Sequence, residues 1–323
     1  MATTAQYLEQ LQADKQMLVD NLVAKGIEAT NDETFTSLVP KVGNISTGIK
    51  GKIYSASYLF YNNYRMNLME ELCALIDESC ELFEYMFYGC TDVENIPSFP
   101  TSNAVSLKSL CADCKKLKKS NIDTSNATDL SYLYANCESL EEIVGLDTSN
   151  ATITDNMLYG CKSLISVSPL NMQNVTKINS MVNNSAITAL TLLNTGNVTQ
   201  LNYAIYNVNS LVDLSEIDAS SVVVCTQAIR SSSLVNFPGF KDLGKSYLPT
   251  QSANFANYAI YLNYCPKLSE ESLISILNNL YDIASNGCQT QKANLGSANL
   301  AKLTSDAGQQ AIANATAKGW TVS

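Results

Sequence analysis

Apolar residues recur along this chain at a spacing that can be counted from a small polar residue. With Asn126 as position 0, Ala127, Leu130, Leu133 and Cys137 occupy positions 1, 4, 7 and 11, and apolar residues follow at positions 14 and 17. The same pattern returns in repeats that begin at Ser79, Asn103, Asn126, Asn150, Asn174, Asn197 and Ser221. Their period of about 23–24 residues is typical of repeats that stack into a solenoid.

The spacing within a repeat predicts its secondary structure. Apolar positions 1, 4, 7, 8 and 11 have helical spacing, and Asn or Ser at position 0 can cap the first turn of a helix. Positions 14 and 17 predict one short strand, and Gly, Pro, Asp and Asn then supply a turn. The six residues "DTSNAT", at Asp123–Thr128 and again at Asp147–Thr152, are such a turn and cap. We therefore predict an α/β solenoid with a short helix and a short strand in each repeat.

Equivalent residues of stacked repeats are expected to form rows. Asparagine suits a turn because it tolerates a left-handed backbone, and a buried thiol behaves as a small apolar group, so we predict structural rows at positions 0 and 11. These rows contain Asn103, Asn126, Asn150, Asn174 and Asn197 at position 0, and Cys90, Cys114, Cys137 and Cys161 at position 11. Cys111 and Cys114 lack a second pair at zinc-binding spacing, so we predict no metal site and no cofactor.

Charged residues fall into the same register. Lys118 and Lys119 stand exactly one period before Glu141 and Glu142 in the sequence. Residues one period apart are neighbours in stacked repeats, which predicts a charge ladder between the two repeats. A ligand site formed by the lysines is the alternative.

The period ends on both sides of the array. Leucines at helical spacing predict an amphipathic helix over residues 3–25. It either belongs to a helical hairpin that packs on itself or on the solenoid, or serves as a docking element or as the contact of a homo-oligomer. Beyond the array we predict a helix over residues 269–287 capped by Ser269, then a strand, a helix and a last strand ending at Trp320. The predicted domains are a helical segment (1–47), an N-terminal cap (48–65), the leucine-rich repeats (66–240), and a final repeat with an α/β cap (241–323).

Composition excludes several functions. The chain has no histidine, so Ser–His and Cys–His catalytic pairs are impossible, and we predict that it is not an enzyme. Its net charge of −10 argues against nucleic acid and anionic membrane surfaces as partners. No apolar run is long enough for membrane insertion, and the first residues lack the pattern of an export signal. We therefore expect a chain made in the cytoplasm without a signal peptide.

Several stretches resemble a known group of proteins. "MFYGCTDVENI" (Met86–Ile96) and "MLYGCKSLISV" (Met157–Val167) resemble bacterial leucine-rich repeats of the BspA-like or treponemal type. The added "LDTSNAT" element is similar to a variant in mycoplasma and gut-bacterial surface proteins, and the segment before the repeats is similar to N-terminal segments of phage-tail proteins. The resemblance implies a leucine-rich repeat fold with a binding role. The chain departs from it where Ser185, Val208 and Ser232 replace cysteine.

Tyrosines are the candidate binding residues. Tyr85 and Tyr132 occupy position 6, and Tyr88, Tyr159 and Tyr206 occupy position 9, outside the predicted core. Tyrosine offers a large contact area with a polar tip and is enriched at interfaces. The alternative is that these side chains only cover the helix face.

Together these features predict a non-enzymatic interaction protein. The main hypothesis is a phage or prophage tail-associated protein of the virion, a fibre or receptor-binding component that contacts a bacterial surface or another virion protein. The alternative is a BspA-like adhesin of the bacterial cell surface. In either case the predicted partner is a protein or a surface glycan.

Overall fold

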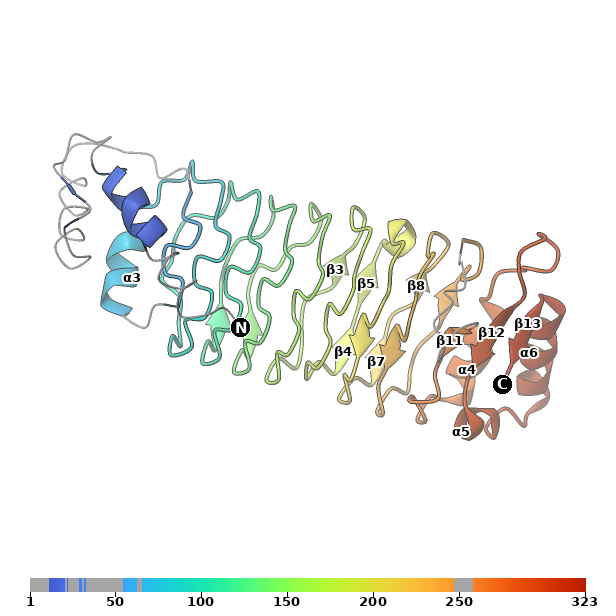
Figure 1. Cartoon of the computed structure of the whole chain (residues 1–323). Helices are drawn as coiled ribbons and strands as arrows, with labels where there is room; N and C mark the ends of the chain where they lie inside the picture. Colours follow the sequence, from blue (N-terminus) through green and yellow to red (C-terminus); the bar gives the residue numbers. More distant parts are fainter. Residues whose placement is uncertain are drawn as a thin grey trace.

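The structure is a computed structural model that describes residues 12–20, 22, 29, 30, 32, 55–62, 66–246 and 258–323. The repeats form an elongated row of coils that lie side by side in sequence order (Figure 1). Helix α3 (Met66–Cys73) lies at one end of the row, and a unit of helices and strands closes the other end.

Neighbouring coils are joined by parallel backbone pairing. One line of single bridges crosses the array, and from Leu82 onward its successive members are one period apart in the sequence. The line runs through Ser55, Leu82, Ser106, Asp129, Ile153, Lys177, Gln200 and Val224. This pairing places equivalent positions of adjacent coils next to each other.

Short strands make a second set of parallel pairs. Each has two residues, and each pairs with the matching segment of a neighbouring coil. The pairs are β1 (Lys119–Ser120) with β2 (Glu142–Ile143), β3 (Leu170–Asn171) with β5 (Leu192–Leu193), β4 (Ala189–Leu190) with β7 (Asp213–Leu214), β6 (Ile205–Tyr206) with β9 (Ile229–Arg230), and β8 (Ile217–Asp218) with β10 (Phe240–Lys241).

The predicted fold class, an α/β solenoid with a helix in every leucine-rich repeat, is wrong. Residues 79–241 contain turns, short strands and the three-residue 3-10 helix η2 (Thr195–Asn197), but no α-helix. Positions 6 and 10 of the coils adopt the left-handed conformation, with φ of 57° at Tyr132 and 58° at Asn136. A right-handed helix cannot continue through two such residues so close together.

Hydrogen bonds show what replaces the helix. In the coil of residues 103–125, the amide of Leu110 donates to the carbonyl of Leu107 at 3.1 Å and closes a turn. The next amide, of Cys111, donates instead to Leu133 of the following coil at 3.0 Å, and the next two amides repeat this alternation. Because every second amide bonds to the neighbouring coil, the ladder of an α-helix cannot form. The three-residue apolar spacing belongs to successive turns.

Free thiols occupy one row of the continuous core. Cys114, Cys137 and Cys161 are fully buried, and none of the ten cysteines forms a disulfide. The Cys137 thiol donates to the carbonyl of Cys111 at 3.0 Å, and the Cys161 thiol to that of Tyr134 at 3.2 Å. Burial raises the pKa of Cys161 to about 12, which keeps its proton available for this bond. Each thiol therefore gives a buried carbonyl of the preceding coil a second donor.

The "DTSNAT" motif is a set of contacts between coils. The Asp147 carboxylate accepts the amide of Ser149 at 2.8 Å, which fixes the turn. The Thr124 hydroxyl donates to the carbonyl of Asp147 at 2.7 Å and accepts its amide at 2.8 Å, while only 1% of Thr124 is exposed. Ala127 lies in the core. The repeated hexapeptide therefore joins neighbouring coils by hydrogen bonds and does not cap a helix.

The asparagine row has a different role from the predicted one. Asn126 donates its side-chain amide to the carbonyl of Ser102 at 2.6 Å, and Asn150 donates to Ser125 at 2.7 Å. The other members of the row make the same bond to the preceding coil at 2.7 Å: Asn103, Asn174 and Asn197. None of the five has the left-handed backbone that we predicted. Their contribution is one hydrogen bond per coil across the stack.

The predicted charge ladder is confirmed, with a different partner for one lysine. Lys119 lies opposite Glu142 in the β1–β2 pair, and their charged atoms are 2.9 Å apart. Lys118 pairs with Glu94 of the preceding coil at 2.7 Å rather than with Glu141. The paired side chains are about half exposed, so each pair contributes little to stability.

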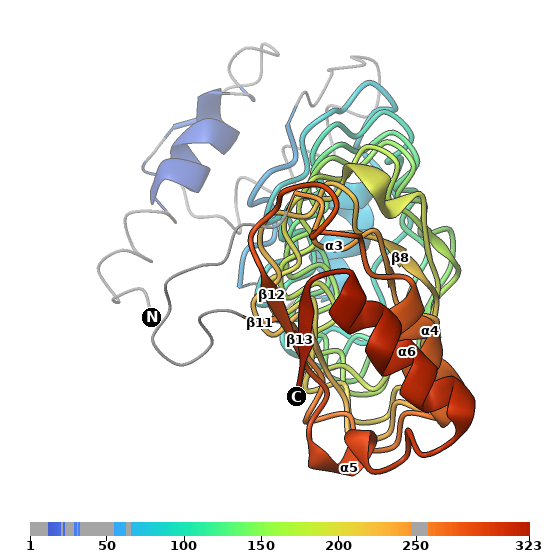
Figure 2. The ribbon, with the colours of Figure 1, turned by 90° about the vertical axis from the view of Figure 1, so that its right-hand side faces the viewer.

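The C-terminal unit covers the last coil (Figure 2). Strands β11 (Tyr258–Tyr261), β12 (Gln291–Asn294) and β13 (Trp320–Val322) form a parallel sheet. Its helices are α4 (Glu270–Asn278), α5 (Ser297–Leu300) and α6 (Asp306–Ala317), and α4 packs against α6. The Ser269 cap is confirmed because its hydroxyl accepts the amide of Ser272 at 3.1 Å. The helix ends at Asn278, however, so the prediction of one helix to residue 287 is wrong.

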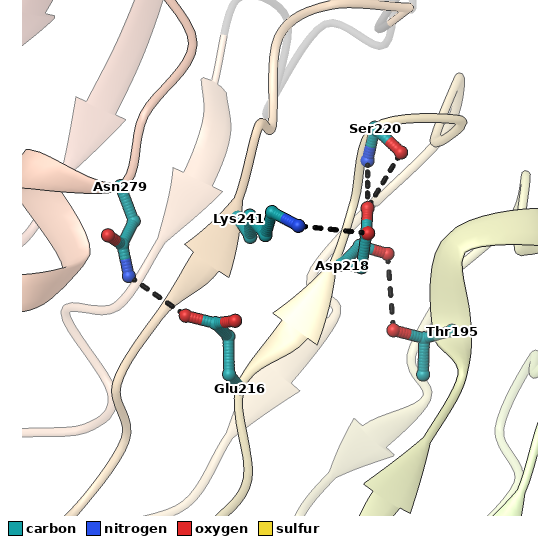
Figure 3. Close-up of polar contacts among 6 residues, drawn as sticks. All are labelled: Thr195, Glu216, Asp218, Ser220, Lys241 and Asn279. Carbon is teal, nitrogen blue, oxygen red and sulfur yellow. Dashed lines mark hydrogen bonds and ion pairs between the residues drawn. The ribbon is translucent and has the colours of Figure 1, made fainter.

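Polar contacts tie this unit to the last coils (Figure 3). The Asn279 side chain, just after α4, donates to the Glu216 carboxylate at 3.1 Å. Within the last coils themselves, Asp218 accepts the amide and hydroxyl of Ser220 at 3.1 and 2.6 Å, with the Lys241 ammonium at 3.6 Å. Burial alone would raise the pKa of Asp218, but these contacts outweigh it and hold the pKa below its usual range.

The N-terminal segment is described only in part. Residues 12–20 are helical, and Val19 and Leu22 are buried in a small cluster against Leu72 and Leu75. Residues 3–11 of the predicted helix, and most of the predicted segment 1–47, lie outside the described residues. Residues 55–62 of the predicted cap form part of a coil, because Ala56 and Phe60 donate their amides to the following coil in the same way as the repeats.

Candidate functional site: the tyrosine face

Positions 6 and 9 of the coils flank the buried positions 7 and 8, and their side chains meet on one side of the array, as the contacts of Tyr85 with Tyr88 and of Tyr203 with Tyr206 show. Parallel pairing repeats this placement from coil to coil at about 4.8 Å. We call this surface the tyrosine face. It comprises Tyr58, Tyr61, Tyr85, Tyr88, Tyr132, Tyr159, Tyr203, Tyr206 and Arg230, with Tyr264 beside Arg230.

Four stacked rings form the N-terminal part of the face. Tyr58 stacks on Tyr85 with ring centres 4.9 Å apart, and Tyr61 stacks on Tyr88 at 5.0 Å. Tyr85 and Tyr88 are 5.9 Å apart within their own coil. Burial raises the pKa of Tyr58, and neighbouring Tyr85 adds to the effect, so this phenol stays neutral at physiological pH. The four rings make one partly exposed aromatic surface.

The middle of the face carries isolated rings. Tyr132 is 43% exposed. The Tyr159 hydroxyl accepts the side-chain amide of Asn184 at 3.4 Å. Small residues, Ser109 and Ala112, occupy the coil between Tyr132 and the N-terminal cluster, so the aromatic surface is interrupted there.

Three tyrosines and an arginine form the C-terminal part of the face. The Arg230 guanidinium carbon lies 5.1 Å from the centre of the Tyr206 ring and 4.2 Å from that of Tyr264. Arg230 also donates from Nη1 to the Tyr206 hydroxyl at 2.7 Å. Tyr203 meets Tyr206 edge-to-face at 5.3 Å and is itself 37% exposed.

The five predicted binding residues all belong to this face, but only some of them lie in clusters of contacting rings. Tyr85 and Tyr88 are in one cluster, Tyr206 is in the other, and Tyr132 and Tyr159 stand apart. Sequence reasoning missed five members: Tyr58, Tyr61, Tyr203, Arg230 and Tyr264. Tyr203 and Arg230 occupy positions 6 and 9 and could have been found by extending the two columns.

The groups that this face presents are mainly aromatic rings with polar tips. Within the described part of the chain, no group of three or more Cys, Asp and Glu side chains could hold a metal ion. The face presents ring surfaces, phenol hydroxyls and one guanidinium, which suit a partner that offers apolar patches and hydrogen-bonding groups. Among the described residues, no helix has both the length and the apolar character needed to cross a membrane.

Comparison with known proteins gives one match. Residues 81–191 match a family model described as "Mycoplasma protein of unknown function, DUF285". No curated protein and no solved structure gave a significant match. The matched region begins in the coil of Tyr85 and Tyr88 and includes Tyr132 and Tyr159.

The match bears on the resemblance seen in the sequence. It agrees with the similarity of the "LDTSNAT" repeats to mycoplasma proteins. The leucine-rich repeat type and the phage-tail likeness of the N-terminal segment find no support in it, and neither does the predicted virion location. The alternative hypothesis, a surface protein of the BspA-like kind, is compatible with the match.

Proposed function

We propose that this chain is a non-enzymatic binding protein of a bacterial cell surface and that it contacts its partner through the tyrosine face. The observation that carries the proposal is the clustering of partly exposed tyrosine rings on one side of the array. Contiguous exposed apolar patches on a protein commonly mark interaction sites, and each end of the face carries a contiguous cluster of rings. The match to the Mycoplasma family supports the surface assignment over a phage tail.

The repeats themselves supply substitutions for a clean test. Position 6 carries serine at Ser109, and position 9 carries alanine at Ala112, so these residues fit the same backbone. The double variant Tyr85→Ser/Tyr88→Ala therefore removes two rings while keeping residues that the array already accommodates. Ile165→Ser is the matched control, because Ile165 is 59% exposed and occupies position 15, outside the tyrosine face.

The assay is flow cytometry of the fluorescently labelled chain on intact bacterial cells and on cultured epithelial cells. We expect saturable binding to at least one cell type, a loss of about tenfold or more in affinity for the tyrosine variant, and no change for Ile165→Ser. The proposal fails if the chain binds neither cell type, or if the tyrosine variant binds as well as the unaltered chain.

A further inference from the structure

Arg230 is held in an unusual way at the C-terminal part of the tyrosine face. It is one of two arginines in the chain, and Tyr206 and Tyr264 both lie against its guanidinium. The planar group is thus fixed by ring contacts and by one hydrogen bond to the Tyr206 hydroxyl at 2.7 Å. A guanidinium held in one orientation loses little entropy when it binds a ligand.

Among the described residues, no carboxylate forms an ion pair with Arg230. The ion pairs of the described residues on the coils join lysines to Asp or Glu, and none includes Arg230. A guanidinium has five N–H donors, and only one of them bonds to a side chain described in the structure. The chain has 30 acidic residues and a net charge of −10, yet no described carboxylate pairs with Arg230, so an external anion can take that place.

We infer that Arg230, Tyr206, Tyr203 and Tyr264 form a binding site for an acidic sugar, a monosaccharide unit bearing a carboxylate within a surface glycan. The inference rests on the proposed function and names the ligand class for one part of the tyrosine face. The remaining N–H groups of Arg230 pair with the carboxylate in the forked geometry that arginine favours. The exposed rings of Tyr203 and Tyr264 contact the apolar face of the sugar, and their phenol hydroxyls form hydrogen bonds with its hydroxyl groups.

The acidic surface of the protein does not prevent such binding. At physiological ionic strength the Debye length is about 8 Å, so carboxylates farther away on the surface are largely screened. A ligand carboxylate in contact with the guanidinium experiences mainly that charge. An acidic peptide would satisfy the arginine equally, but it lacks the flat carbon face that the exposed rings can cover.

The test is titration of the full chain with sialyllactose, with a glucuronate-terminated oligosaccharide, with lactose as the neutral control, and with tetraglutamate as the peptide control. Binding is followed by saturation-transfer NMR and calorimetry. We expect both acidic sugars to bind and lactose and tetraglutamate to bind at least roughly tenfold more weakly. Arg230→Gln is expected to abolish the preference for sialyllactose over lactose, and Arg230→Lys, which keeps the charge without the fork, to retain only part of it.

Other outcomes refute the inference. Equal affinity for sialyllactose and lactose, or tetraglutamate as the tightest ligand, would show that the site does not read an acidic sugar. If Arg230→Gln lowers the melting temperature but leaves sugar affinity unchanged, Arg230 has a structural role between Tyr206 and Tyr264 and does not bind the sugar. Cell binding of the Tyr85→Ser/Tyr88→Ala variant separates the two proposals. Loss of cell binding for Tyr85→Ser/Tyr88→Ala, together with no sugar binding, leaves the proposed function standing and removes the acidic-sugar site.

Discussion

Thr124→Val tests whether the repeated hexapeptide fastens neighbouring coils. The substitution keeps the shape of a side chain that is 1% exposed and removes only its hydroxyl. That hydroxyl bonds to both backbone groups of Asp147, at 2.7 and 2.8 Å. A hydrogen bond contributes about 0.5–1.5 kcal/mol net, so losing two is expected to lower the free energy of unfolding by about 1–3 kcal/mol.

Thr128→Val is the matched control, because it makes the same change four residues later in the same motif. The Thr128 hydroxyl donates to the carbonyl of Val105 at 3.1 Å, but Thr128 is exposed, so water can replace the lost donor. We expect a loss below about 0.5 kcal/mol for this variant. The assay is urea unfolding followed by circular dichroism, with hydrogen exchange of the Asp147 amide as the local readout. Equal losses of unfolding free energy for the two variants would refute this role of the Thr124 hydroxyl, and so would an unchanged exchange rate of the Asp147 amide in Thr124→Val.

Three further predictions follow from the packing. Of the ten cysteines only Cys288 is not buried, so a thiol reagent is expected to label one site per native chain and all ten in denaturant; fast labelling of several native thiols would contradict the buried row. Gly160 and Gly145 both have positive φ, so replacing either with alanine is expected to lower the free energy of unfolding by about 1–2 kcal/mol, measured by urea unfolding. The loss is expected to be larger for Gly160→Ala, because its new methyl group would lie 2.7 Å from a side-chain oxygen of the preceding coil, whereas that of Gly145→Ala meets nothing closer than 3.9 Å. Hydrogen bonds from Ser125 lower the pKa of Asp123 in the folded protein. The stabilisation that Asp123 provides is therefore complete above the unfolded pKa, near 3.9, and is lost as the pH falls through the folded pKa. Asp123→Asn is expected to weaken the fall of the melting temperature at acid pH, measured by thermal unfolding at a series of pH values; an unchanged fall would contradict this role.

Some of this architecture could be predicted from the sequence, and some could not. The period read from the apolar pattern is also the sequence separation of the bridged residues, because each coil buries the same columns. The helix in each repeat was wrong because consecutive turns and a helix both place apolar residues three or four apart. Position 10 did carry a signal for turns, since it holds residues that accept a left-handed backbone, such as Gly89, Asp113 and Asn136.

The candidate site shows a similar limit. The columns at positions 6 and 9 gave Tyr85, Tyr88 and Tyr206 because the repeats align there. The contact of Arg230 with Tyr264 could not be predicted in this way, because the insertion after the last repeat breaks the period between them. Periodicity identifies which residues share a row, but contacts between the last coil and the C-terminal unit depend on packing outside the repeat.

Distances between spin labels test the stacking of the coils most directly. Labels on Lys119→Cys and Asn236→Cys, in a Cys288→Ser background, mark equivalent exposed positions separated by five coil steps. At about 4.8 Å per step, parallel stacking predicts roughly 24 Å for this pair and roughly 19 Å when the second label is on Asp213→Cys. A separation that does not shorten by about one coil step when the label moves from Asn236 to Asp213 would contradict the parallel stacking on which the tyrosine face depends.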